Sequence, residues 1–313
     1  MNSRAGLAEL ALALVCFFWG ATFVLVKNAL TDISPMLFLA IRFSIASTLL
    51  AGVYALRRGS AKVIWGGGII CGVFLMVGYF LQTLGLRFDT TPAKSGFLTA
   101  LYIPLVPVLI AIVYRKLPSL SEWLGVGLAT AGMAMMTLTA ESLRISLGDA
   151  LTVGCAVAYA IHILLLSHFS RLVQTEWLAL LQILTCAVVA ISTVKVVESP
   201  FVRWTPNVWL ALGVTSALST ALAFLLQTWG QKHTTPTRAA LVFSLEPVFA
   251  WLTSYVVEHE VLTGRVLAGA ACILSGILLV EIKPLGRRQT SEKVKVAETV
   301  TSDRPSTFES GSL

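Results

Sequence analysis

The sequence predicts an all-α transmembrane protein whose ten helices form two inverted five-helix repeats. Three observations predict this fold class. Hydrophobic residues make up 56% of the 313 positions and charged residues 12%, about half the charge that soluble domains carry. Ten apolar runs follow one another with short connections, and the last five repeat features of the first five. We assign residues 1–140 and 141–283 to the two repeats and residues 284–313 to a disordered cytoplasmic tail.

Each predicted helix is an apolar segment of about the 20 residues that cross a hydrocarbon core about 30 Å thick. The connections hold turn and helix-breaking residues, such as Asp32 and Pro35 after the first segment, Pro118 before the fifth, and Pro200 and Pro206 before the eighth. Loops this short leave no room for a soluble domain. In chain order the segments are residues 7–26, 35–56, 63–86, 92–114, 121–139, 147–168, 176–197, 207–229, 236–257 and 264–282.

The net charge of +7 and the five cysteines argue against several other classes of protein. Lys and Arg lie singly between apolar runs and form no dense patch with interleaved aromatics, so we expect no nucleic-acid partner. The cysteines lack the CxxC or Cys/His spacing of metal sites, so we expect no metal and no cofactor. Residues 284–313 are rich in Ser, Thr, Glu and Lys and hold too few large apolar residues to join a packed bundle.

The distribution of basic residues predicts the orientation of the chain, because cytoplasmic loops are enriched in Lys and Arg. Twelve basic residues fall on the side of the N-terminus and seven on the opposite side, which places both termini in the cytoplasm. The twelve are Arg4, Arg57, Arg58, Lys62, Arg115, Lys116, Arg171, Lys232, Arg238, Lys283, Arg287 and Arg288, and the seven are Lys27, Arg87, Lys94, Arg144, Lys195, Arg203 and Arg265.

Self-similarity between the two halves is the strongest signal in the sequence. Residues 81–85 read Leu-Gln-Thr-Leu-Gly and residues 226–230 read Leu-Gln-Thr-Trp-Gly, and each block is followed by Thr-Thr-Pro, at residues 90–92 and 234–236. The repeat unit is therefore five helices. Because five is an odd number, the second copy enters the bilayer from the opposite side, an arrangement typical of secondary transporters.

Four motifs, in this order, carry a resemblance to a known family. They are Phe-Trp-Gly-Ala-Thr-Phe at residues 18–23, Ala-Ile-Arg-Phe at 40–43, Leu-Gln-Thr-Leu-Gly-Leu at 81–86 and Leu-Glu-Pro-Val-Phe-Ala at 245–250. With them the chain resembles the drug/metabolite transporter superfamily, in its EamA-type branch of ten-helix transporters, over about residues 7–282. The halves depart from each other in one respect, since the fourth segment has Tyr102-Ile103-Pro104 where the ninth has Glu246-Pro247.

The resemblance implies a function, which composition alone does not indicate. It implies two five-helix halves around a central cavity, here between the first, third, fourth, sixth, eighth and ninth segments. Such a protein moves a small metabolite, an amino acid or similar solute, across the cytoplasmic (inner) membrane without ATP, and we expect the direction to be export. We expect access to alternate between the two sides as one half rocks against the other.

Two charged residues within the apolar segments are the main candidates for substrate binding. Glu246 lies ten residues after Pro236, roughly 15 Å along the helix at about 1.5 Å per residue and so near the bilayer midplane. A carboxylate there is costly and typically marks an ion or substrate route, although a neutral Glu bonded to a neighbouring helix is the structural alternative. Arg42 binds an anionic substrate group or pairs with Glu246, unless its long side chain snorkels to the interface.

The remaining candidates are amide, aromatic and histidine side chains, and each has a structural alternative. The equivalent amides Gln82 and Gln227 either contact substrate or bond across to a neighbouring helix. In-span aromatic residues either wall the cavity or pack ordinarily, and His162 is either a proton relay or a satisfied core histidine. The aromatic candidates are Trp19, Tyr79, Tyr102 and Tyr159, and the prolines expected to bend their helices are Pro104, Pro107 and Pro247.

These observations favour a secondary transporter with a small-molecule substrate in a lipid bilayer, with proton coupling through Glu246 as an option. Two other classes stay open at this point. A membrane-embedded enzyme needs a nucleophile with its base or a metal cluster, and no HExxH or GxSxG motif occurs in the spans. A passive channel or a membrane receptor predicts flux without saturation or no flux at all. No Walker A motif occurs, which disfavours direct use of ATP.

Overall fold

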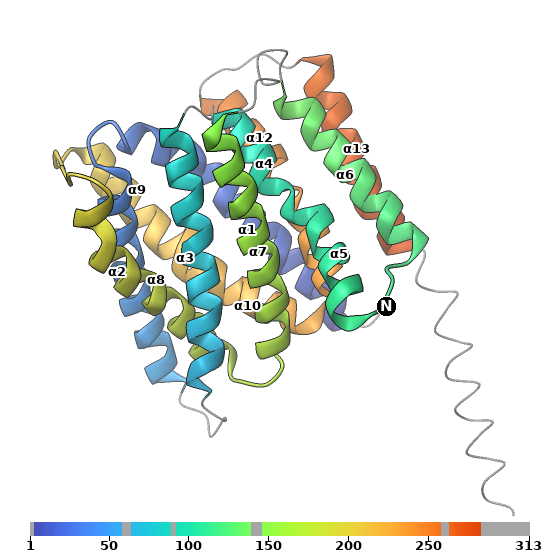
Figure 1. Ribbon diagram of the computed structural model, residues 1–313, viewed down its shortest axis with the longest axis horizontal. Coiled ribbons are helices and arrows are strands. Elements are labelled where there is room, and N and C mark those ends of the chain that lie inside the picture. The colour runs from blue at the N-terminus through green and yellow to red at the C-terminus, as the bar shows by residue number, and fades with distance from the viewer. Residues whose placement is uncertain (1–2, 58–63, 89–91, 139–145, 258–262, 283–313) are drawn as a thin grey trace, which may run out of the picture.

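The computed structural model describes residues 3–57, 64–88, 92–138, 146–257 and 263–282, and it shows a bundle of packed helices (Figure 1). The first half holds α1 (Ser3–Ala29), α2 (Pro35–Leu56), α3 (Trp65–Arg87), α4 (Pro92–Ala100), α5 (Tyr102–Tyr114) and α6 (Leu120–Thr137). The second holds α7 (Leu147–Phe169), α8 (Thr175–Val197), α9 (Pro206–Ser216), the π-helix η2 (Ala217–Leu222), α10 (Ala223–His233), α11 (Pro236–Phe243), α12 (Glu246–Val257) and α13 (Gly264–Ile282).

All ten predicted segments are helical in the described residues, which confirms the predicted fold class. Eight spans there are long and apolar enough to cross a membrane, counting α4 with α5, α9 to α10, and α11 with α12 as one span each. The other two segments are α6, with 18 residues, and α13, with 19. The predicted tail at 284–313 lies outside the described residues, as do Arg58, Lys62, Arg144, Lys283, Arg287 and Arg288 of the orientation count.

Proline breaks the fourth and the ninth spans at equivalent places. A proline inside a helix has no N–H to donate, and its ring clashes with the carbonyl group four residues earlier. Helix α4 ends at Ala100, four residues before Pro104, and α11 ends at Phe243, four residues before Pro247. The predicted bends at these two prolines are therefore present as helix breaks, whereas Pro107 lies inside α5.

The contacts between helices show the two-fold relation of the repeats. In the first half α1 packs on α10 and α12 of the second, and its equivalent α7 packs on α3 and α5. Helix α2 packs on its equivalent α8, and α6 on α13. Two ion pairs, one buried and one partly buried, follow the same relation, since Lys94 of α4 meets Asp149 of α7 and Arg238 of α11 meets Glu9 of α1. The halves therefore interlock, and each side of the bundle mixes helices from both.

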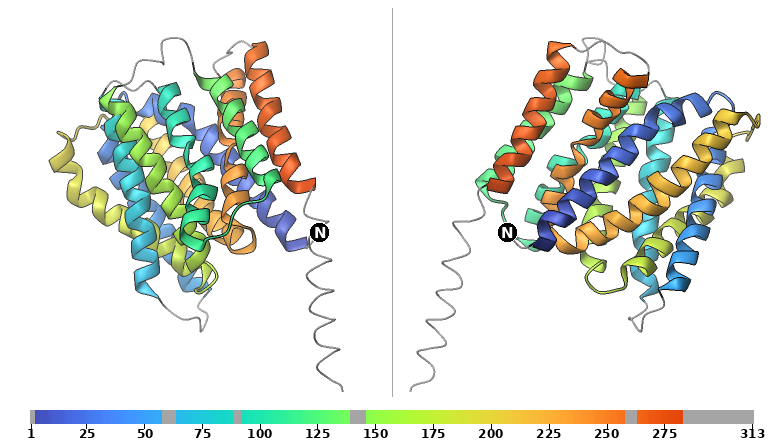
Figure 2. Two further views of the ribbon diagram at one scale, coloured as in Figure 1. Left: turned by 45° about the vertical axis from the view of Figure 1, so that its right-hand side comes forward. Right: turned by 180° about the vertical axis from the view of Figure 1, so that it is seen from behind.

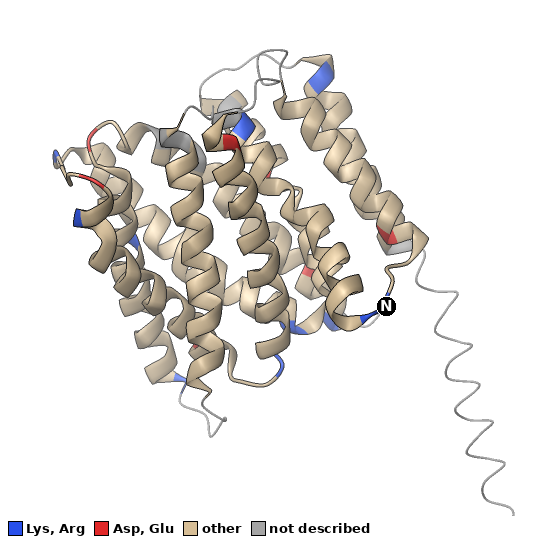
Figure 3. Ribbon diagram, viewed as in Figure 1, with Lys and Arg blue, Asp and Glu red and all other residues tan. Residues whose placement is uncertain are grey.

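The bundle has two ends that we call the N-terminal face and the distal face. The N-terminal face is where α1 begins, and it also carries the α7–α8 and α10–α11 connections (Figure 2). The distal face carries the α1–α2 turn, which the α8–α9 connection holds by a backbone bridge between Ile33 and Val202 and by an Arg203–Asp32 ion pair of 3.1 Å. Charged residues gather toward these two ends and leave a largely uncharged band between them (Figure 3). The chain is a multi-pass membrane protein.

Candidate functional site

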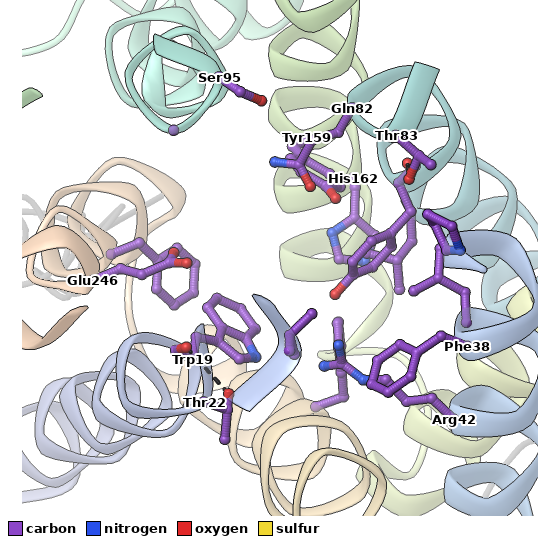
Figure 4. Close-up of a pocket in the computed structure, with 18 of the residues that line it drawn as sticks. Trp19, Thr22, Phe38, Arg42, Gln82, Thr83, Ser95, Tyr159, His162 and Glu246 are labelled. Atoms are coloured by element: carbon purple, nitrogen blue, oxygen red, sulfur yellow. Dashed lines mark hydrogen bonds between the residues drawn. The ribbon is translucent and has the colours of Figure 1, made fainter. Parts of the chain in front are cut away.

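A cavity of about 540 Å³ opens at the distal face and reaches into the bundle between α1, α2, α3, α4, α5, α7, α10, α11 and α12 (Figure 4). Residues Leu30, Thr31 and Pro35 of the α1–α2 turn and Ser95 and Gly96 of the first turns of α4 line its mouth. The lining ends more than one helical turn before α7 and α10 end at the N-terminal face. Within the described residues, the cavity is thus open on one side and closed on the other.

All nine residues proposed from the sequence line this cavity. They come from seven helices that are far apart in the chain, so the fold brings together side chains that the sequence only suggests as a set. Contact with a substrate is not shown by this arrangement. The nine are Trp19, Arg42, Tyr79, Gln82, Tyr102, Tyr159, His162, Gln227 and Glu246.

Tyrosine rings from three helices form one wall of the cavity. Tyr159 of α7 meets Tyr79 of α3 edge-on at 5.8 Å between ring centroids and Tyr102 of α5 at 6.4 Å. Such edge-to-face pairs are a favoured aromatic geometry. Gly78 of α3 makes the packing possible, because a Cβ atom there would collide with the Tyr159 ring. The wall is therefore rigid and largely apolar, with phenol groups as its polar atoms.

Arg42 is buried, lines the cavity and is held by the π-helix η2. Its Nε donates to Thr220 Oγ1 at 2.7 Å and its Nη2 to the Ser219 carbonyl oxygen at 3.3 Å. Trp19 Nε1 donates to the same carbonyl at 3.0 Å, and the Thr22 and Ser219 hydroxyls lie 2.7 Å apart. At 7% exposure the guanidinium does not snorkel to the interface.

Glu246 is the first residue of α12, directly after the helix break, and it lines the cavity from the side of α12. Among the described residues, no hydrogen bond or ion pair joins its carboxylate to another side chain, so the pairing with Arg42 considered from the sequence is not formed. Gly20 lets α1 lie close to this place, since a Cβ there would come within 2.6 Å of the Ala250 nitrogen. Close packing thus holds Glu246 at the cavity wall.

The two equivalent amides differ in their surroundings. Gln82 Nε2 donates to Thr99 Oγ1 at 2.9 Å, so it bonds across to the neighbouring helix as one of the two alternatives predicted. Gln227 is buried, and its Oε1 has no hydrogen-bond partner among the described residues. A buried unsatisfied oxygen is rare in native proteins, which makes Gln227 the stronger candidate for contact with a ligand.

His162 lines the cavity and also belongs to a buried polar chain. Its Nε2 lies 2.9 Å from Gln182 Oε1, and Gln182 Nε2 donates to Thr228 Oγ1 at 3.1 Å. The imidazole is therefore a satisfied core histidine on the side facing α8. The chain continues from the cavity toward the N-terminal face.

Sequence reasoning missed helix α2, lining residues such as Phe38, and the two residues of η2 that bind Arg42. Helix α2 was not among the predicted cavity helices, yet Phe38 and Arg42 both line the cavity. Ser219 and Thr220 fix Arg42, and their only signal in the sequence was a cluster of small hydroxyl residues in an apolar span. A search of the described residues finds no group of three or more His, Cys, Asp or Glu side chains able to hold a metal ion.

Comparisons with known proteins find a matching family, related sequences and a solved structure with the same fold. The sequence model of the EamA-like transporter family matches residues 6–138 and 146–282. An uncharacterized transporter of Archaeoglobus fulgidus is 33% identical over 283 residues, covering 88% of this chain and 86% of that protein. The uncharacterized transporter YvbV of Bacillus subtilis is 27% identical, with 88% and 91% covered. One solved crystal structure shares the fold with a TM-score of 0.77 at 20% identity, over 91% of this chain and 99% of that chain.

Proposed function

The chain belongs to the EamA-like transporter family, and from that premise we propose that it is a secondary transporter of an amino acid or a similar small metabolite. The observation that carries this proposal is the cavity, which is open at one face, closed at the other and lined by two charges within the membrane. Secondary transporters built from inverted repeats bind their substrates in such a place.

The two charges support a zwitterionic substrate. Arg42 and Glu246 line the same cavity, and no described ion pair joins them. A charge within the membrane is costly unless something compensates it. A ligand with a carboxylate for Arg42 and an ammonium group for Glu246 compensates both at once, and an α-amino acid carries these two groups.

The rest of the cavity supports an apolar side chain on that substrate. Tyr79, Tyr102 and Tyr159 present their rings on one side, and Phe38, Phe224 and Phe243 line it elsewhere. Small-molecule sites are typically apolar, with a few placed polar groups that fix orientation. The volume of about 540 Å³ lies within the range of such sites.

The helix contacts support a revised form of alternating access. The sequence suggested that one five-helix half rocks against the other, but the halves interlock. We propose that α3, α4, α5 and α7 form one moving unit and that α1, α10, α11 and α12 form the other. The ion pair between Lys94 and Asp149 lies inside the first unit, and the pair between Arg238 and Glu9 lies inside the second. Both pairs can therefore stay formed during the cycle.

We place the protein in the cytoplasmic membrane with both termini in the cytoplasm, on the basic-residue count given above. The distal mouth of the cavity then faces outward. We propose export as the direction of transport. Reporter fusions at Met1 and Leu313 should both report a cytoplasmic location, and an external C-terminus would contradict the ten-span arrangement.

The test is uptake by the purified protein in liposomes, with a panel of labelled amino acids and with or without an imposed proton gradient. We expect saturable uptake of at least one zwitterionic member, inhibited by excess unlabelled substrate. A proton gradient should change the rate if Glu246 exchanges a proton for the substrate. Flux that never saturates would indicate a channel, and no flux of any member would contradict the proposal.

A further inference from the structure

A stripe of buried polar side chains leads from the floor of the cavity toward the N-terminal face. Gln227 and Gln231 of α10 are spaced by four residues and so lie on one face of the helix, and Thr234 is the C-cap residue directly after it. Their exposures are 2%, 0% and 6%. Gln227 Oε1, Gln231 Nε2 and Thr234 Oγ1 have no hydrogen-bond partner in the described part of the chain.

The partners that the stripe does have show which helices it faces. Ser167 Oγ of α7 donates to Gln231 Oε1 at 3.2 Å, and Arg171 Nη2 donates to the Thr234 carbonyl oxygen at 3.1 Å. The stripe therefore lies against the end of α7, between the cavity and the N-terminal face. Three unsatisfied polar atoms in such a place are costly. They are explained if they line a pathway that is closed and without water in this conformation and open in another.

The repeat relation points to the same place independently. Residues of α1 and α7 correspond at a separation of 140 positions, as Glu9 and Asp149 of the two ion pairs show. Leu30 and Thr31, which line the open distal mouth, correspond in this way to Ser170 and Arg171.

The third helix of each repeat agrees with this relation. Gln82 and Gln227 are 145 positions apart, so Thr83 at the open mouth corresponds to the buried Thr228. If each repeat took the conformation that the other has in this structure, the bundle would open beside the polar stripe.

Resting on the proposed transport function, we propose that Gln227, Gln231, Thr234 and Ser167 line the path that the substrate takes between the cavity and the N-terminal face when the distal mouth is closed. Their amides and hydroxyls suit a polar or zwitterionic solute. The π-helix η2 directly precedes α10, and π-helical segments are common at functional sites. Because η2 binds Arg42, a ligand at Arg42 contacts a side chain that is hydrogen-bonded to η2, and α10 begins directly after η2.

The test is thiol labelling of a Gln231→Cys variant during turnover. The parent is the full chain with its five cysteines replaced by alanine, reconstituted in liposomes and checked for the uptake shown by the unmodified chain. A charged, membrane-impermeant methanethiosulfonate is supplied on both sides. The control is Thr215→Cys, since Thr215 is equally buried and its Oγ1 also lacks a described partner, but it lies outside the cavity and the stripe.

During turnover, Gln231→Cys should be labelled several-fold faster than Thr215→Cys, and labelling should stop uptake. Equal, slow labelling of the two variants while uptake continues would overturn the proposed path. If Gln231→Cys does not transport, Ser167→Cys takes its place under the same criteria. Inactivity of both, with Thr215→Cys active, supports the path. An unmodified chain that transports nothing contradicts the proposed function itself, and the path with it.

Discussion

The two repeats use the same scaffold with different chemistry at equivalent positions. Both break a span four residues before a proline, at Ala100 in the first repeat and at Phe243 in the second. The helix that follows the break begins with Tyr102 in the first repeat and with Glu246 in the second. Helix α2 carries Arg42 where α8 carries Gln182, 140 positions apart.

The difference shows where the side chains of the two repeats diverge on a shared fold. Each repeat supplies one charge to the cavity, and the other repeat has a neutral residue at the matching position. The shared features, such as the helix breaks and the paired contacts of α6 with α13, hold the shape. Exchanging residues between the repeats is therefore a direct way to test which features are chemical and which are structural.

Replacing Glu246 with Gln should have the largest effect. The amide keeps the size of the side chain but removes its charge and its ability to titrate, so packing should survive. A hydrogen bond to a charged group is worth about 1.5–3 kcal/mol, so we expect uptake to fall roughly tenfold or more and any dependence on a proton gradient to disappear. Normal uptake with unchanged pH dependence, measured in liposomes with thermal stability as the control, would leave Glu246 a structural residue.

Arg42→Gln, which installs the residue of the other repeat, should weaken substrate affinity selectively. The variant loses the charge that we assign to the substrate carboxylate, and by the same energy we expect an apparent affinity roughly tenfold lower. An amine that lacks the carboxylate should compete equally well with the parent and the variant. Competition against labelled amino acid measures this, and equal weakening for both ligands would argue against the assignment.

Gly132→Val should lower stability without specific loss of substrate binding. Gly132 lies in the contact between the equivalent helices α6 and α13, outside the cavity. Helices α6 and α13 approach closely here, and a Cβ at Gly132 would meet the Gly269 carbonyl and Ile273. Overpacking of this kind costs about 1–3 kcal/mol. Gly127→Val on the same helix is the matched control, since nothing lies within 4 Å of its Cβ position. Equal melting temperatures of the two variants would contradict the close α6–α13 packing.

Removal of the residues after Arg288 should have the smallest effect. The sequence there lacks the apolar content to join the bundle, so insertion and uptake should match those of the full chain. A truncated protein that reaches the membrane with normal stability but no longer transports would show that this stretch takes part in transport.

The spans and nine of the residues that line the cavity could be predicted because they leave local signals in the sequence. Apolar runs set the helices, and prolines such as Pro104 and Pro247 set the breaks. The π-helix η2 could not be predicted, because Ala217–Leu222 contains neither Pro nor Gly, and its hydroxyl and carbonyl groups are bound by Trp19 and Arg42 from distant helices. The partners of Arg42 depend on how distant helices pack. From the sequence, Glu246, the membrane–water interface and a ligand were all open as surroundings of its guanidinium.

Calorimetric binding of leucine, leucinamide and N-acetyl-leucine to the purified protein tests most directly whether the cavity holds a zwitterion between its two charges. The amide lacks the carboxylate and the acetyl derivative lacks the ammonium group. We predict that each binds roughly tenfold or more weakly than leucine, and that leucine and leucinamide bind alike to the Arg42→Gln variant. Equal affinity of the unaltered protein for all three ligands would contradict the assignment of Arg42 and Glu246 to the two ends of the substrate.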